Sequence, residues 1–229
     1  MDVAVAQRQW DGYVAALNAS GWRTLEAPPA ADCPDGVFVE DTVVVFGAFA
    51  VVTRPGPPSR RTEIDAMPEV LGALELEVAR IDPPGTLDGG DVLKVGTDVY
   101  VGHGGRTNAS GVRQLRQLLE PRGHRVIAVP VTKVLHLKSA VTALPDGTVI
   151  GYEPLVDDAR IFPRFRPMPE ESGAHVVVLD EEQVLMAADC PLSAALVQSL
   201  GYDVVTVDIG EFQKLEACVT CLSVRLRHL

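Results

Sequence analysis

Apolar positions and turn signals alternate along this chain in a pattern that predicts repeated pairs of short strands, most of them followed by a helix. A helix over 3–20, ended by Gly21, and a short strand over 22–25 come first. Four units then follow: strands 37–46 and 49–53 with helix 61–74; strands 87–95 and 98–102 with helix 108–120; strands 134–142 and 148–151 with a looser stretch to Pro169; and strands 176–179 and 184–186 with helix 191–200. Strands over 204–207 and 219–227 are expected to begin a fifth unit.

Polar residues recur at one place in these units. Asp41, Asp88 and His136 lie 47 and 48 residues apart, and Cys221 holds a comparable place in the last unit. A fixed period of this length is typical of repeat architectures, in which units too small to bury their own apolar face pack on their neighbours. We therefore expect a single α/β domain over 1–229, with five units around an axis and these four side chains converging at one end.

Composition narrows the classes of protein and of partner. Hydrophobic residues make up 47% of the 229 residues, which is enough for a substantial core. The net charge of −11 argues against a nucleic-acid binder, which needs a basic face. The sequence lacks a run of about 18 apolar residues and a signal-peptide pattern, so neither a membrane partner nor export is expected. Four scattered cysteines suggest the reducing cytoplasm.

The acidic candidates differ in how specific their signals are. Glu40 and Asp41 are expected inside an apolar strand, where buried carboxylates are costly unless a cation pairs with them. A planar guanidinium would satisfy such a pair through bidentate hydrogen bonds. Asp88, in the run Asp-Gly-Gly-Asp, is also compatible with a plain turn, and its phase in the repeat is what favours a functional role.

His136 and Cys221 each leave alternatives open. His136, between two leucines, is compatible with a core histidine, whereas a cysteine in matching phase favours acid–base chemistry. Cys221 is compatible with a buried spacer, a nucleophile, or a Cys-x-x-Cys pair with Cys218. A zinc site would need a second pair of ligands, and a redox pair normally opens a helix, whereas the sequence after Cys221 is strand-like.

The motifs that carry these residues form a recognisable set. In order along the chain they are FVEDT at 38–42, RPGPPSRR at 54–61, LDGGDV at 87–92, GRTN at 105–108, LHLKS at 135–139 and TCLS at 220–223. Together they resemble the dimethylarginine dimethylaminohydrolases, of the guanidino-group-modifying superfamily that includes the arginine deiminases. The resemblance covers nearly the whole chain and implies a five-bladed, pseudo-symmetric α/β propeller.

One departure from the family concerns the last blade. Family members usually carry a further N-terminal strand and loop, whereas this sequence begins at what reads as the first helix. We therefore expect an incomplete last blade, with an open edge beside Cys221 that would allow a homodimer to form.

The resemblance also implies a role for each candidate. Cys221 matches the nucleophile, His136 the acid–base, and Asp88 the carboxylate partner of that histidine. The positions that match substrate-binding residues are Asp35, Glu40, Asp41, Arg60, Arg106 and Leu215. No metal is implied at this site.

The implied activity is hydrolysis of a small guanidino compound. Dimethylarginine or monomethylarginine would give citrulline and dimethylamine or methylamine through a covalent Cys221 thiouronium intermediate, without a metal or an organic cofactor. Two alternatives remain: a guanidine hydrolase of the arginine deiminase type, and a guanidino-ligand binding protein with impaired catalysis. Two arginines suited to a substrate carboxylate, Arg60 and Arg106, favour an amino-acid substrate over agmatine.

Overall fold

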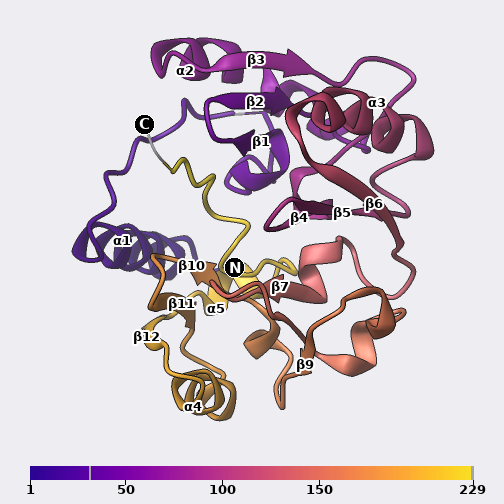
Figure 1. Cartoon of the computed structure of the whole chain (residues 1–229). Coiled ribbons are helices and arrows are strands. Elements are labelled where there is room, and N and C mark those ends of the chain that lie inside the picture. Colours follow the sequence, from indigo (N-terminus) through magenta and orange to yellow (C-terminus); the bar gives the residue numbers. More distant parts are fainter. Residues whose placement is uncertain (31, 228–229) are drawn as a thin grey trace. The chain divides into compact units, whose positions relative to one another are not determined.

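The computed structural model describes residues 1–30 and 32–227, whose contacts form two compact units. The first unit contains residues 1–26 and 139–220, and the second contains residues 27–138 and the segment from Cys221 onward. Figure 1 traces both along the sequence. None of the helices that the structure describes has the length and the apolar composition that a membrane span needs.

The second unit contains two three-stranded sheets built on one plan (Figure 1). In each sheet an antiparallel hairpin is followed by a helix and a third strand, which pairs in parallel with the second. A parallel neighbour needs a long crossover, and the helix supplies it. The elements are β1 (Val43–Phe46), β2 (Phe49–Val52), α2 (Met67–Ala73) and β3 (Glu77–Arg80), then β4 (Val92–Val95), β5 (Asp98–His103), α3 (Ala109–Leu119) and β6 (Arg125–Pro130).

The first unit has two further sheets with the same pairing of strands and adds helix α1 (Val3–Ala19). In one of these sheets two 3₁₀ turns, Glu153–Leu155 and Ala159–Ile161, take the place of the helix before the third strand. Its sheets have the strand orders β7-β8-β9 and β10-β11-β12. Their elements are β7 (Val141–Ala143), β8 (Val149–Gly151), β9 (Phe165–Pro167), β10 (Val177–Val178), β11 (Gln183–Ala187), α4 (Pro191–Ser199) and β12 (Asp203–Val207), followed by α5 (Gly210–Gln213). Helix α1 packs against α5 and β12, and Tyr13 at its buried face donates a 2.9 Å hydrogen bond to the Val219 carbonyl oxygen.

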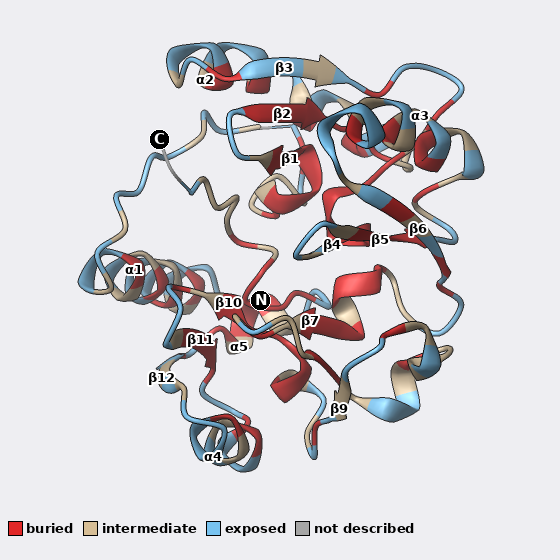
Figure 2. Cartoon of the chain, viewed as in Figure 1, coloured by how far each residue is buried: buried red, intermediate tan, exposed pale blue. Residues whose placement is uncertain are grey.

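Valine-rich hairpins form much of the core of the second unit. β1 and β2 are buried along almost their whole length (Figure 2). Two-residue turns close the hairpins of this unit, and Gly47 and Gly96 at these turns have φ of 59° and 58°. Only glycine adopts this left-handed conformation without strain, so these residues fix the hairpin register.

In each sheet, the role of the third strand was not predicted from the sequence. β3 and β6 lie in stretches with no prediction, because half or more of their residues are exposed and the apolar alternation is weak. The strand expected at 204–207 exists as β12, but it completes the fourth sheet instead of beginning a fifth unit. The expected strand at 22–25 is wrong, since the described residues there form none.

The expected first strands begin too early. Three 3₁₀ turns precede the hairpins: Val39–Thr42 before β1, Gly89–Asp91 before β4 and Leu137–Ser139 before β7. Buried carboxylates take main-chain N–H groups in this region, and such bonds compete with a strand ladder. The helix expected at 61–74 likewise divides into a 3₁₀ segment, Pro58–Ile64, and α2.

The segment after Cys221 is not the strand that the sequence predicts. Residues 221 and 222 form a turn, and residues 223–227 have no regular secondary structure. Among the described residues this segment belongs to none of the four sheets, so the prediction of a strand over 219–227 was wrong.

Candidate active site

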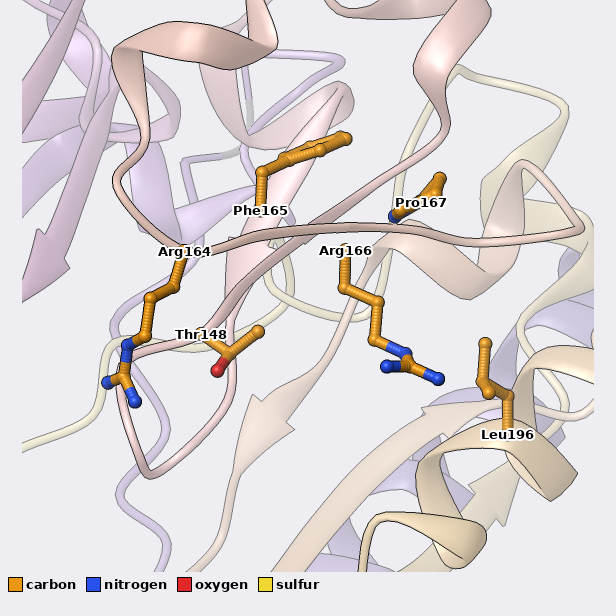
Figure 3. Close-up of a pocket in the computed structure, with 6 residues that line it drawn as sticks. All are labelled: Thr148, Arg164, Phe165, Arg166, Pro167 and Leu196. Carbon is orange, nitrogen blue, oxygen red and sulfur yellow. The ribbon is translucent and has the colours of Figure 1, made fainter.

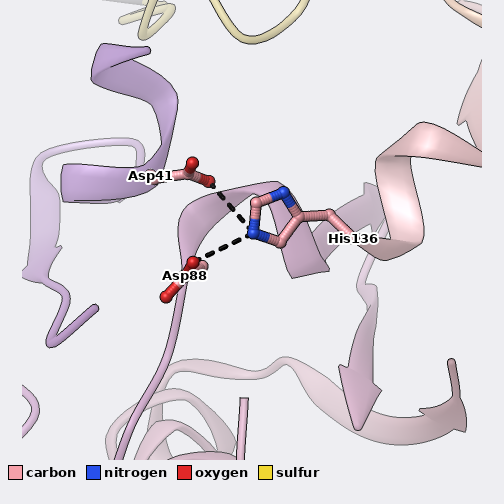
Figure 4. Close-up of side chains that lie close together, drawn as sticks. All are labelled: Asp41, Asp88 and His136. Atoms are coloured by element: carbon pink, nitrogen blue, oxygen red, sulfur yellow. Dashed lines mark hydrogen bonds and ion pairs between the residues drawn. The ribbon is translucent and has the colours of Figure 1, made fainter. Parts of the chain in front are cut away.

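Three buried side chains from equivalent places in the repeat meet in the second unit (Figure 4). Asp41 lies in the turn before β1, Asp88 directly precedes the turn before β4, and His136 precedes the turn before β7. His136 Nε2 lies 2.9 Å from Asp88 Oδ2 and 3.8 Å from Asp41 Oδ1. The structure therefore confirms that the repeat brings these three side chains together.

Main-chain donors hold the two aspartates in place. The Gly56 N–H donates to Asp88 Oδ1, and the Gly90 N–H donates to Asp41 Oδ1, each at 2.8 Å. Asp88 is fully buried, so these bonds offset the cost of removing its charge from water. Each carboxylate therefore has one oxygen fixed by the backbone.

The surrounding carboxylates keep His136 protonated. Burial alone lowers the pKa of His136, but the charge of Asp41, the hydrogen bond to Asp88 and the charges of Asp91 and Asp88 outweigh it. Together they raise the pKa of His136 to about 9. At neutral pH the imidazole is therefore a cation with a proton to donate.

Arg60 is bonded on several sides to acidic groups. Its Nη1 donates to Asp41 Oδ2 at 2.7 Å, while Nε and Nη2 donate to the two carboxylate oxygens of Glu63 at 2.9 and 2.8 Å. The carboxylate of Asp35 is more distant, 3.9 Å from Arg60 Nε, and its side chain is 46% exposed. Burial lowers the pKa of Arg60, but its bonds to Glu63 and Asp41 outweigh burial and raise it.

Glu40 belongs to a second charged group beside Asp41. Its Oε1 accepts hydrogen bonds from Lys138 Nζ at 2.6 Å and from Arg225 Nη2 at 3.1 Å. Burial raises the pKa of Glu40, but these two cations outweigh burial and lower it below the ordinary range. The Glu40 N–H also donates to the Cys221 carbonyl oxygen at 3.2 Å.

Cys221, Arg106 and Leu215 complete the predicted set. Cys221 is half-buried in a turn, and Arg106 Nη1 lies 3.5 Å from Asp88 Oδ2 with a side chain 21% exposed. Leu215 lies in the turn after α5, in the first unit, and is 41% exposed. All predicted site residues except Leu215 therefore belong to the second unit.

The turn Gly89–Asp91 approaches its neighbours too closely for any side chain at its first two positions. A Cβ at Gly89 would lie 1.9 Å from the Glu40 carbonyl oxygen, and one at Gly90 would lie 2.7 Å from His136 Nδ1. The two glycines are thus required for the approach of Asp41 and His136. The sequence suggests only a turn for this run, because the steric need for glycine depends on neighbours that are distant in the chain.

The same three side chains have the spacing of a metal site. Ligand atoms of Asp41, Asp88 and His136 lie within 4.8 Å of one another. Both carboxylates already accept hydrogen bonds from protein N–H groups, and Arg60 pairs with Asp41. A metal ion here would have to compete with these donors.

The site also contains residues that the sequence did not predict. Lys138 in LHLKS pairs with Glu40, Glu63 pairs with Arg60 three residues earlier, and Asp91 and Thr107 bond to each other beside Asp88. Lys138, Asp91 and Thr107 lie in the motifs quoted above, so their motif membership was the available signal.

A groove in the first unit has a different character. Its volume is about 340 Å³, and it is lined by Thr148, Arg164, Phe165, Arg166, Pro167 and Leu196 (Figure 3). None of the predicted site residues lines it. The described residues that line it include no carboxylate, thiol or imidazole side chain, so they do not offer the chemistry of the Asp41–Asp88–His136 cluster.

Comparisons with known proteins place the chain in a family. The arginine deiminase family model matches residues 73–210. An N(G),N(G)-dimethylarginine dimethylaminohydrolase of Streptomyces coelicolor is 63% identical over all 229 residues, which cover 89% of its own length. The chain belongs to the dimethylarginine dimethylaminohydrolase family. A second member, from Pseudomonas aeruginosa, is 35% identical over 98% of this chain and 89% of its own length.

Solved structures of dimethylarginine dimethylaminohydrolases have the same α/β fold. A Pseudomonas aeruginosa structure in complex with citrulline superposes with a TM-score of 0.92 at 34% identity, over 98% of this chain and 89% of that one. A structure of an adduct with S-methyl-L-thiocitrulline gives the same TM-score at 33% identity, over 98% and 90%. The N-terminal domain of the arginine dihydrolase ArgZ, at 18% identity and a TM-score of 0.89, shares the fold.

Proposed function

We propose that this member of the dimethylarginine dimethylaminohydrolase family hydrolyses Nω-methylated arginine to citrulline and dimethylamine or methylamine. The observation that carries the proposal is the position of His136 between the carboxylates of Asp41 and Asp88. It gives a proton donor beside groups that complement a guanidinium. The 63% identity to a dimethylarginine dimethylaminohydrolase supports the same reaction.

Substrate binding follows from charge. The guanidinium is planar and cationic, and Asp41, Glu40 and Asp88 offer carboxylates for it. Arg106, the partly exposed arginine beside Asp88, suits the substrate carboxylate. Arg60 is assigned to the same carboxylate, and there a substrate would compete with Asp41 and Glu63. Asp35 is assigned to the substrate amino group and the Leu215 main chain to a further contact.

The first half-reaction transfers the amidine carbon to the enzyme. The Cys221 thiolate attacks the guanidinium carbon and forms a C–S bond. As the tetrahedral species collapses, the bond from this carbon to the dimethylamine nitrogen breaks, and His136 donates its proton to that nitrogen. Dimethylamine leaves, and a thiouronium group remains on Cys221.

The second half-reaction returns the enzyme to its starting state. His136, now neutral, takes a proton from water while the oxygen of that water attacks the thiouronium carbon. The C–S bond then breaks, the electron pair returns to the Cys221 sulfur, and the second proton of the water is released. One water is consumed, citrulline is released, and neither an oxidant nor a metal is required.

A second proposal concerns how the four sheets form one fold. We propose that the four sheets are blades of one five-bladed α/β propeller over 1–229. The four-fold repetition of one hairpin-plus-strand plan supports this. We also propose that the protein binds a small guanidino compound, forms a homodimer and is located in the cytoplasm. Sedimentation equilibrium measures whether the protein is a dimer.

A four-compound assay tests the reaction. Dimethylarginine, monomethylarginine, arginine and agmatine are each incubated with the protein and with Cys221→Ser, and ureido product and released amine are measured. The proposal expects citrulline from the two methylated arginines at rates well above arginine. Ammonia from arginine at the higher rate would favour a deiminase. Binding without product would favour a guanidino-ligand binding protein.

A further inference from the structure

We infer that Asp91 is a positioning residue, which fixes His136 and Asp88 relative to each other through the main chain beside each of them. The inference rests on the proposed function, in which these two residues act as a pair. Asp91 is not among the residues that the family resemblance assigns, and its carboxylate contacts neither His136 nor Asp88 through a hydrogen bond between side chains.

The bonds of the Asp91 carboxylate reach both partners. Oδ1 accepts the Leu137 N–H at 2.9 Å, in the peptide directly after His136. Oδ2 accepts the Thr107 hydroxyl at 2.6 Å, and the same hydroxyl oxygen accepts the Asp88 N–H at 3.2 Å. One carboxylate thus ties the backbone at His136 to the backbone at Asp88.

The surrounding strand is shaped to hold this carboxylate. Asp91 is only 2% exposed, and Gly102 on β5 lies directly against it. A Cβ at Gly102 would be 2.4 Å from Asp91 Oδ1. The absence of a side chain at Gly102 therefore makes room for Asp91, and this is a steric observation independent of the hydrogen bonds.

The charge of Asp91 also acts on His136. It is one of the carboxylates that raise the pKa of His136, after Asp41 and the bond to Asp88. Burial raises the pKa of Asp91 itself to about 6, so it is ionised above neutral pH. Asp41 and Asp88 also act on His136. Asp41 pairs in turn with Arg60, and Asp88 pairs with Arg106.

Asp91→Asn separates position from charge, because the amide keeps an acceptor for Leu137 but loses the negative charge. In the pH profile of kcat, we expect the alkaline limb, which is set by His136, to move down by about one pH unit. The KM for dimethylarginine should stay within about twofold of the wild-type value. Thr107→Val, which breaks the link to Asp88 without removing charge, should lower kcat and leave the limb in place. Asp98→Asn on β5, whose carboxylate is paired with Arg125 at the surface, is the matched control and should change neither.

A second readout does not depend on turnover. In the Cys221→Ser background, the His136 resonances are titrated by NMR with and without Asp91→Asn, and circular dichroism confirms the fold. A lower His136 pKa in Asp91→Asn supports the action of the Asp91 charge on His136. Displaced His136 resonances in Thr107→Val support the positioning role, even if the wild-type protein fails to hydrolyse methylarginine. An unchanged His136 pKa together with an unchanged kcat would overturn it. If Asp91→Asn does not fold, Thr107→Val decides, and wild-type kcat in that variant would overturn the link to Asp88.

Discussion

The Glu40 N–H donates a 3.2 Å hydrogen bond to the Cys221 carbonyl oxygen. Glu40 precedes Asp41 in the 3₁₀ turn before β1, whereas Cys221 lies 181 residues later in the sequence. This bond joins the turn that carries Asp41 to the main chain of the proposed nucleophile. It supports the placement of Cys221 beside the acidic cluster.

Cys221→Ser should abolish turnover while the fold is retained, since a hydroxyl lacks the reactivity of a thiolate. Cys218→Ser should be far milder, because Cys218 is buried and its sulfur lies 3.2 Å from the Thr220 hydroxyl. Citrulline formation and circular dichroism of both variants provide the check. Equal loss in the two variants would favour a working Cys-x-x-Cys pair.

Arg106→Ala should weaken the inhibition of turnover by arginine more than the inhibition by agmatine, which has no carboxylate. A hydrogen bond between charged groups contributes about 1.5–3 kcal/mol, so the loss for arginine should be at least tenfold. Inhibition constants for both compounds, measured on wild type and variant, give the comparison. A loss of equal size for both would mean that Arg106 acts on Asp88 and not on the substrate carboxylate.

Arg60→Ala should lower the free energy of unfolding as well as activity. The substitution leaves Asp41 and Glu63 buried without their shared cation, and breaking a buried ion pair costs about 3–5 kcal/mol. Urea unfolding followed by circular dichroism measures the change. Arg160→Ala, which removes an ion pair at the surface, is the control and should leave stability unchanged within error. Equal effects would contradict the structural role of Arg60.

The hairpins and the acidic cluster could be predicted from the sequence because both depend on local, repeated patterns. The Val43–Phe46 and Phe49–Val52 strands have continuous apolar runs, and Asp41, Asp88 and His136 recur at nearly equal spacings of 47 and 48 residues. The edge strand β3 was missed because its exposed polar residues carry no apolar pattern.

The features that could not be predicted from the sequence depend on contacts between residues that are far apart in the chain. The 3₁₀ turns depend on hydrogen bonds such as Leu137 N–H to Asp91 Oδ1, which span 46 positions. The pairing of Arg60 with Asp41 spans 19 positions, and that of Lys138 with Glu40 spans 98. Residue type suggests such charges, but the choice of partner follows only from the folded chain.

His136 should make stability depend on pH. Its pKa rises from 6.5 to about 9 on folding, so its stabilising contribution is complete below about pH 6.5 and is lost as pH rises through 9. A shift of this size corresponds to on the order of 3 kcal/mol. The difference in free energy of unfolding between wild type and His136→Asn should therefore shrink from pH 6.5 to 9.5 in urea titrations. A difference that stayed constant would show that folding does not raise the pKa of His136.

We expect Cys221 to form a covalent bond with the amidine carbon while His136 protonates the departing amine. This step can be trapped by acid quenching during the first turnover with dimethylarginine, followed by intact-mass and peptide mass spectrometry. A thiouronium adduct is expected on the peptide containing Cys221, in amounts equal to the dimethylamine released in that turnover. Release of dimethylamine with no adduct, or an adduct on Cys218, would show that Cys221 is not the nucleophile.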